Sequence, residues 1–376
     1  MTNRYEERSR LSGVRMICSQ LGGFLAVSVP GVIMQFTGKD NSFTYTLTGL
    51  IFSCVFCIAV FITWYSTWEA KDVHQEYDFK VDTQRSSGVI NHLKYLVLDL
   101  FSSFRIRAFR LHILIYIFSF TAMDVFGSVF TYYVVYCLSQ DAAAVSGWLS
   151  IAAFASVPGT YGFMLLLNRL NMTPSAALRL SYSCIFLVLA FLFTVYLTKT
   201  EVPTLLFSAV FILLGAARSG LYYIPWNIYS FIPDIDEIVT QQRREGIFAG
   251  VMVLTRKSTV AIAIMIIGLV LQESGFVKGS GAQPESALGA IIGLMIFATA
   301  ALLAVSFFAT YKFKLTRETH KVLLKEIARR KLGGDYRDCD ASTRVVIKQL
   351  TGYEYDQVWG GDATRLAVGE NLSIVK

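Results

Sequence analysis

The chain has 376 residues, of which 54% are hydrophobic and 16% charged, and its mean hydropathy is +0.50. This composition excludes an ordinary soluble domain and predicts an all-α, polytopic membrane helix bundle. The net charge of +7 does not indicate a nucleic-acid partner, because the basic residues flank apolar stretches, as in proteins that obey the positive-inside rule.

A transmembrane helix needs about 20 apolar residues, and eight stretches approach this length. They are 16–36, 44–65, 111–137, 145–167, 180–197, 205–231, 247–271 and 287–310. The segments on one side of these stretches hold only Lys39, Lys199 and Lys278, whereas the dense basic clusters fall on the other side. We therefore expect a multi-pass protein of the cell inner membrane with both termini in the cytoplasm.

The connection between the second and third stretches, 69–110, is charged and has an amphipathic part around 93–104. It predicts a cytoplasmic loop, part of which lies as a helix on the inner membrane surface. A solvated linker is the alternative for 77–88.

The third stretch contains Asp124, with hydroxyl side chains on neighbouring turns. A carboxylate inside the membrane is costly and usually serves a transport pathway or an ion pair. Near the outer end of this stretch, Tyr132, Tyr133 and Tyr136 fit two roles, the lining of a cavity or anchoring at the membrane interface.

Arg218, Tyr222 and Trp226 are spaced four residues apart, so they should share one face of their helix. Aromatic rings stack on the C–H faces of sugars, and an arginine fork bonds hydroxyl pairs or a carboxylate. This pattern predicts a sugar site. The alternative is that Arg218 forms a structural ion pair with Asp124.

On the next helix, Gly246, Gly250, Val253 and Lys257 share a stripe. Small residues allow another helix to approach closely, so we expect Lys257 to face the centre of the bundle. Farther on, 311–334 predicts an amphipathic basic helix that ends at a glycine pair, in a cytoplasmic tail.

Four features occur in order around the loop from Pro233 to Gly246: the pair Pro225–Trp226, a carboxylate cluster, the sequence Arg-Arg-Glu-Gly, and Lys257 twelve residues after Glu245. In this combination the loop resembles that of the glycoside-pentoside-hexuronide:cation symporters, the melibiose-carrier-like branch of the major facilitator superfamily. The resemblance implies cation-coupled uptake of a sugar by alternating access, with sodium or protons as the coupling ion. It identifies the gating-loop residues as Asp234, Asp236, Glu237, Arg243, Arg244 and Glu245.

The opening segment 5–15 resembles the family's loop between its fourth and fifth helices. The resemblance therefore implies a partial major facilitator fold with helices five to twelve. Its parts would be 1–68, the last two helices of the N-terminal half; 69–110, the middle loop; 111–312, the C-terminal half; and 313–376, a tail whose part 343–360 resembles the extended tail of some members. The family's cation-binding carboxylates lie mainly on its second and fourth helices, so the resemblance assigns none of them to this chain.

Two matches extend the expected substrate site. Arg15 matches a family arginine that contributes to sugar binding, although a positive-inside anchor is the alternative, and Lys257 matches a lysine implicated in cation coupling and sugar binding. The expected substrate-binding residues are Arg15, Asp124, Tyr132, Arg218, Tyr222, Trp226 and Lys257.

Arg218 and Lys257 outnumber the one clear membrane carboxylate, Asp124, which favours an anionic substrate such as a uronic-acid glycoside or oligosaccharide over a neutral disaccharide. We expect a monomer without metal or cofactor apart from the coupling cation, because the six cysteines lie mostly in apolar stretches. No H-E-x-x-H, G-x-S-x-G or P-loop sequence indicates an enzyme. The alternative function is a non-transporting remnant that serves as a membrane scaffold or partner subunit.

Overall fold

The computed structural model describes the backbone of residues 5–37, 42–67, 100, 102–140, 142–199, 203–242 and 244–359, and its regular elements are all helical. The chain divides into two compact units. One comprises Met1–Cys18 with Leu96–Lys376, and the other comprises Ser19–Tyr95. Each unit is described by itself.

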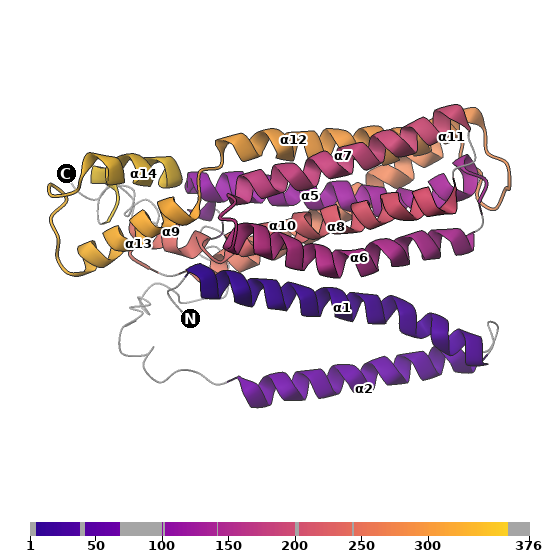
Figure 1. The fold of residues 1–376 in the computed structure, drawn as a ribbon, viewed down its shortest axis with the longest axis horizontal. Coiled ribbons are helices and arrows are strands. Elements are labelled where there is room, and N and C mark those ends of the chain that lie inside the picture. Colours follow the sequence, from indigo (N-terminus) through magenta and orange to yellow (C-terminus); the bar gives the residue numbers. More distant parts are fainter. Residues whose placement is uncertain are drawn as a thin grey trace, which may run out of the picture. The chain divides into compact units, whose positions relative to one another are not determined.

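The first unit begins with the opening part of α1 (Tyr5–Thr37) and continues with a bundle of long helices (Figure 1). Its further elements are η1 (Ser103–Arg105), α5 (Arg107–Tyr132), η2 (Tyr133–Cys137), α6 (Ala142–Asn168), α7 (Pro174–Thr198), α8 (Thr204–Tyr229), α9 (Ile232–Thr240), α10 (Glu245–Glu273), α11 (Glu285–Ile292), η3 (Gly293–Ala298), α12 (Thr299–Lys312), α13 (Arg317–Lys331), α14 (Ala341–Thr351) and η4 (Tyr355–Gln357). Of these, η2 and η3 are π-helical turns.

Seven helical stretches within the described residues are long and apolar enough to cross a membrane. They correspond to the predicted stretches from 44–65 onward, and the chain is therefore a multi-pass membrane protein. The first predicted stretch, 16–36, is helical within α1 but is not one of these seven.

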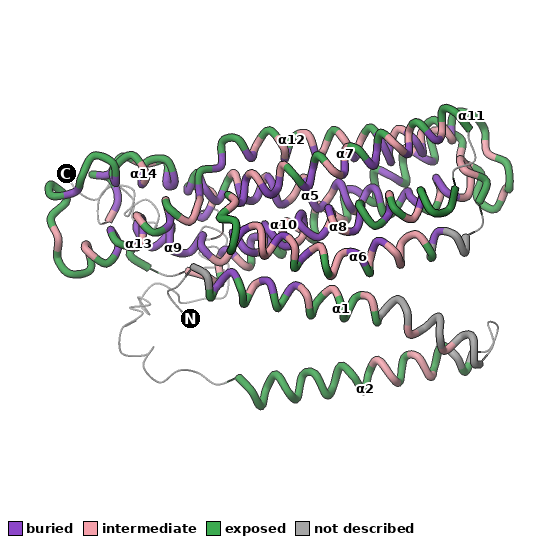
Figure 2. The backbone as a smooth tube through the Cα atoms, in the orientation of Figure 1, coloured by how far each residue is buried: buried purple, intermediate pink, exposed green. Residues whose placement is uncertain are grey.

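Helix α5 lies at the centre of the first unit and packs against α8, α10 and α12. Its buried face includes Phe109, Ile115, Val129 and Phe130, none of which is measurably exposed. Figure 2 shows the same contrast between the buried turns of α5 and the exposed outer turns of its neighbours. This packing fixes the rotation of α5 about its axis and so determines which neighbouring helix each of its polar residues faces.

Glycines bring α6 and α8 into direct backbone contact. A Cβ atom added at Gly159 on α6 would lie 2.7 Å from the Cα atom of Ala216, and one added at Gly215 on α8 would overlap the carbonyl group of Ala152. Both helices continue through an internal proline, Pro158 in α6 and Pro225 in α8. The close approach holds the polar face of α8 in a fixed rotation.

The opening part of α1 joins α8 through a buried polar network. The amide of Asn227 donates to the hydroxyls of Ser9 (2.7 Å) and Tyr223 (3.0 Å), and Tyr223 bonds the main-chain carbonyl of Ser9 at 3.3 Å. All three residues are buried, so this network helps to fix the opening part of α1 against the bundle, together with the buried side chain of Met16.

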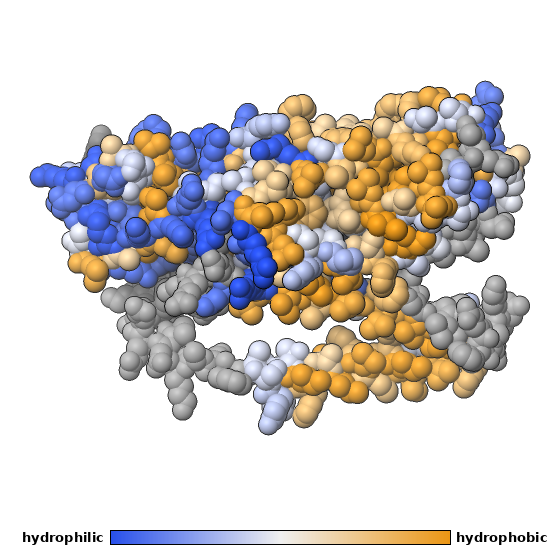
Figure 3. Space-filling view, viewed as in Figure 1, coloured by the Kyte–Doolittle hydropathy of each residue, from blue (hydrophilic) through white to orange (hydrophobic). Residues whose placement is uncertain are grey.

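The tail folds against one end of the first unit. The predicted amphipathic helix of 311–334 is shorter than expected, α13 covering Arg317–Lys331 and ending before Gly333, whose φ is +85°. Helix α14 packs on α5 and α9, and the amide of Trp359 donates to the carbonyl of Ile238 at 3.1 Å. Figure 3 shows polar surface over α13 and α14 and apolar surface along α6 and α7.

In the second unit, α2 (Ser42–Ser66) is exposed along most of its described length, and its apolar window has no buried residue. Of the predicted amphipathic part at 93–104, the residues up to 99 lie outside the described ones, and Ser103–Arg105 forms the short 3-10 turn η1 of the first unit.

Candidate functional site

Arginines and aromatic rings from four helices meet beside Asp124. We name this the arginine–aromatic cluster, and its members are Arg15 of α1, Tyr116, Phe120 and Asp124 of α5, Arg218, Tyr222 and Trp226 of α8, and Arg256 of α10. Most of these side chains are half-buried, and Arg15 is exposed.

The four-residue spacing of Arg218, Tyr222 and Trp226 places them along one side of α8. The Arg218 guanidinium lies 5.1 Å from the centre of the Tyr222 ring and donates to its hydroxyl at 3.4 Å. One turn farther, the guanidinium of Arg15 lies 4.7 Å from the centre of the Trp226 ring. A guanidinium that stacks on a ring face carries its N–H groups around its own edge, where they can bond a ligand.

Asp124 is held by Arg256. The two form a bidentate pair, in which Nη2 donates to Oδ1 at 2.8 Å and Nη1 bonds Oδ2. The alternative pairing of Asp124 with Arg218 is therefore wrong. Rotation of α10 about its axis decides the partner, because it brings Arg256 to the α5 side.

Ring contacts connect the α5 and α8 faces. Phe120 meets Tyr222 edge to face at 4.6 Å and Tyr116 at 4.5 Å, and Tyr116 meets Trp226 at 6.0 Å. Arg256 also lies 5.2 Å from the centre of the Phe120 ring. The cluster is thus a continuous series of ring contacts from buried Tyr116 and Phe120 to half-buried Tyr222 and Trp226, with guanidinium groups along it.

Two expected members lie elsewhere. Tyr132 lies near the far end of α5, in edge-to-face contact with Phe276 at 5.3 Å and stacked on Tyr136. Lys257 is exposed on α10. A Cβ added at Gly246 would meet nothing within 4 Å, and one at Gly250 would meet only Leu100, so the small-residue stripe has no closely packed helix among the described residues.

Sequence reasoning missed three members, Tyr116, Phe120 and Arg256. A signal was present for the rings, because Tyr116 and Phe120 precede Asp124 by eight and four residues and so share its helical face. Arg256 is adjacent to Lys257, and no local pattern tells which of two neighbouring cations faces the bundle.

A second polar site surrounds α9, where three carboxylates each bind a partner on another segment. We name Asp234, Asp236 and Glu237 with these partners the carboxylate clamp. Asp234 is 1% exposed and accepts from Arg8 of α1 at 2.7 Å, and its Oδ2 lies 2.8 Å from Nε2 of His320 on α13.

The other two carboxylates extend the clamp. Arg244 forks onto Asp236 at 2.6 and 2.8 Å and also donates to Ser102 at 2.9 Å, before α5. Glu237 pairs with Lys331 of α13 at 2.7 Å. α9 is thereby joined to α1, α13, the segment before α5 and the start of α10.

The other two expected gating-loop residues are Arg243 and Glu245. Arg243 lies outside the described residues. Glu245 begins α10, where its main-chain carbonyl accepts a hydrogen bond from the Tyr229 hydroxyl at 3.0 Å.

Comparison with known proteins agrees with a transporter. Residues 1–317 match the model of the family described as MFS/sugar transport protein. An uncharacterized symporter of Synechocystis, sll1374, is 28% identical over 266 residues, which is 68% of this chain and 47% of that protein. The uncharacterized symporter YnaJ of Bacillus subtilis is 22% identical over 335 residues, 88% of this chain and 67% of that protein.

The chain spans about half the length of the first of these relatives. The family match covers most of the chain and agrees with its helical membrane architecture. The chain belongs to the MFS/sugar transport protein family.

Proposed function

We propose that this chain carries a sugar or glycoside across the membrane, and that the arginine–aromatic cluster binds it. The cluster is the observation that supports this most strongly. It combines ring faces for stacking with guanidinium forks for hydroxyl or carboxylate groups, which is the chemistry that a sugar needs.

The charges favour a sugar that bears a carboxylate. Arg256 is already neutralised by Asp124, whereas Arg15 and Arg218 contact rings and a hydroxyl. In the described part of the chain, no carboxylate is paired with Arg15 or Arg218. A uronide would supply that negative charge, and the match with a sugar transport family is consistent with such a substrate.

The carboxylate clamp supplies a closing device at the cytoplasmic end. Asp236 is fully buried, and its partner Arg244 is 8% exposed. Buried pairs of this kind have two discrete states, made or broken, so they suit alternation between a closed and an open cavity. Under this proposal α9 leaves its partners when the cytoplasmic side opens.

Coupling to sodium or protons through Lys257 completes the proposal. Both relatives are named symporters, and Lys257 follows Arg256 in the sequence, with its side chain exposed on α10.

Uptake tests the proposal. Cells or vesicles that contain the protein are given a labelled methyl glucuronide or methyl glucoside, with sodium or proton gradients imposed separately. We expect the glucuronide to be carried preferentially, and Arg218→Gln to lower its kcat/KM at least tenfold while changing that of the glucoside much less.

The matched control is Arg179→Gln on α7, because Arg179 also stacks on a tyrosine, Tyr311, at 4.6 Å but lies outside the cluster. Equal carriage of the two sugars, with a ratio unaffected by Arg218→Gln, would show the charge argument to be wrong. Absence of gradient-dependent uptake of either sugar would overturn the carrier proposal.

A further inference from the structure

A cavity of about 910 Å³ opens at the end of the first unit that is opposite α9 and α13. It lies among the end of α5 with η2, the start of α6, the end of α7, and the starts of α8 and α11. Small-molecule sites commonly measure about 300–1,000 Å³, so the volume suits a sugar ring or a disaccharide.

The cavity is separate from the arginine–aromatic cluster. Tyr136, in its wall, follows Asp124 by twelve residues on the same continuous helix, which corresponds to about 18 Å at 1.5 Å per residue. On α8, Phe207 of the cavity and Tyr222 of the cluster are fifteen residues apart, which corresponds to about 22 Å. A ligand in the cavity would therefore not touch the cluster.

Several residues in the wall of this cavity have an uncommon backbone conformation. Ser139 and Lys199, both in its wall, have φ angles of +53° and +50°, which non-glycine residues rarely adopt. A third wall segment is the π-helical turn η2, which contributes Tyr136 and Cys137. The left-handed residues Lys199 and Ser139 each follow the end of a helix, which is a common way for a helix to stop, and after Ser139 the amide of Gln140 donates to the carbonyl of Val134 at 3.1 Å. That explanation does not cover the π-helical turn η2, and π-helical turns are frequent at functional sites.

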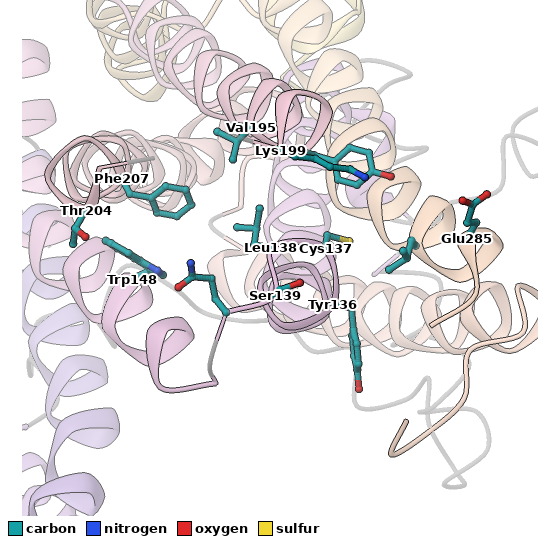
Figure 4. A pocket seen from close by; sticks show the side chains of 13 residues that line it. Tyr136, Cys137, Leu138, Ser139, Trp148, Val195, Lys199, Thr204, Phe207 and Glu285 are labelled. Atoms are coloured by element: carbon teal, nitrogen blue, oxygen red, sulfur yellow. The ribbon is translucent and has the colours of Figure 1, made fainter. Parts of the chain in front are cut away.

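The lining has the chemistry of a carbohydrate site. Figure 4 shows Trp148, Phe207 and Thr204 on one side of the cavity, Glu285 on the opposite side, and Ser139 between them. Trp148 is half-buried against Phe207 at 4.8 Å, which fixes its ring for stacking. Hydroxyl groups, one amine and one carboxylate together suit sugar hydroxyls. An apolar ligand would leave these polar groups unpaired.

We propose that this cavity is an outer binding site for a saccharide, which holds a sugar ring before it reaches the arginine–aromatic cluster. The inference rests on the proposed function, because the orientation of the protein and the class of ligand follow from a sugar carrier whose clamp is cytoplasmic. Its position agrees with the outside location predicted for Lys199.

Thiol labelling tests the proposal on the full chain in intact cells. Ser139→Cys places a reactive thiol in the wall, and a membrane-impermeant maleimide is added from outside with methyl glucuronide, methyl glucoside or mannitol. We expect either glycoside to slow labelling at position 139 at least threefold, and mannitol to have no effect. Adding Trp148→Ala should abolish the protection.

Two controls are matched to this design. Lys278→Cys is exposed outside the cavity and should label at the same rate with or without sugar, and the chain without an added cysteine gives the background from Cys137. Thr204→Cys, also in the wall and exposed, replaces Ser139→Cys if that variant does not fold.

The outcomes separate this inference from the proposed function. Protection by methyl glucuronide that persists in Arg218→Gln, where its uptake is lowered at least tenfold, supports a second site. Labelling unaffected by any saccharide, or slowed equally in Trp148→Ala, overturns the outer site, and uptake measured in the same cells shows independently whether the carrier proposal still holds.

Discussion

At the scale of single residues, the first prediction concerns the ion pair of Asp124 and Arg256. Both side chains are about one-fifth exposed, so the pair is only partly screened by solvent. Asp124→Asn leaves the guanidinium without its carboxylate inside the bundle, and we expect it to lower the free energy of unfolding by about 1–3 kcal/mol. Thermal unfolding of the purified protein measures this loss.

A double-mutant cycle provides the control for that pair. Asp124→Asn leaves the positive charge of Arg256 unpaired, and Arg256→Gln removes that charge. The double variant should therefore be more stable than the sum of the two single losses predicts. Strictly additive losses would show that the two side chains do not interact as the structure indicates.

Asp340 gives a prediction that depends on pH. It caps α14, accepting from the Ser342 hydroxyl and from the Thr343 amide at 3.2 Å. The hydrogen bond from Ser342 has the largest effect on the pKa of Asp340, followed by the hydrogen bonds from Thr343. Together they lower this pKa from its ordinary value of 3.8 to about 2. A carboxyl whose pKa is lower in the folded state stabilises above pH 4, and that contribution is lost as the pH falls toward 2.

Hydrogen exchange of the α14 peptide, corrected for the intrinsic rate at each pH, measures this effect. We expect wild-type protection to fall between pH 4 and pH 2. Asp340→Asn, which caps without titrating, should show a smaller fall over the same range. Identical profiles for the two proteins would rule out a role for the cap charge.

At the scale of helices, close packing of α6 on α8 depends on glycine. Gly215→Val would place side-chain atoms against the carbonyl group of Ala152, and overpacking of this kind costs typically about 1–3 kcal/mol. We expect a correspondingly lower melting temperature. Gly162→Ala on α6 is the matched control, because a Cβ there meets nothing within 4 Å; an equal loss in both variants would contradict the packing argument.

The carboxylate clamp allows a comparison within one helix. Asp236 is fully buried, whereas Glu237 pairs with a lysine that is 49% exposed. Removing one partner of a fully buried pair costs about 3–5 kcal/mol, and a pair whose lysine is exposed to solvent is worth less. Asp236→Asn should therefore speed hydrogen exchange across α9 much more than Glu237→Gln does. The reverse order would show that α9 is held mainly through Lys331 of α13.

At the scale of the whole molecule, the basic-residue asymmetry predicts topology. Reporter fusions after Lys39, Lys199 and Lys278 should be active only outside, because positively charged loops are retained in the cytoplasm. Fusions after Gly334 should report the cytoplasm and serve as the internal control. Cytoplasmic activity at two of the three sites would refute this topology.

The sequence by itself determined the membrane class, the course of the long helices and the polar face of α8. These follow from local rules, since apolar length predicts a span and a four-residue spacing places Arg218, Tyr222 and Trp226 along one side of a helix. Arg15, which the resemblance assigned to the sugar site, contacts Trp226, which the helical spacing assigned to it.

Only the tertiary structure decided which charges meet. Arg256 and Lys257 point about 100° apart on the same helix, and the packing of α10 against α5 brings Arg256 to Asp124 while Lys257 stays exposed. Asp234 binds Arg8 and His320 across 226 and 86 positions of the chain. No local periodicity specifies such partners, because ion pairs at this separation depend on how the helices are rotated and stacked.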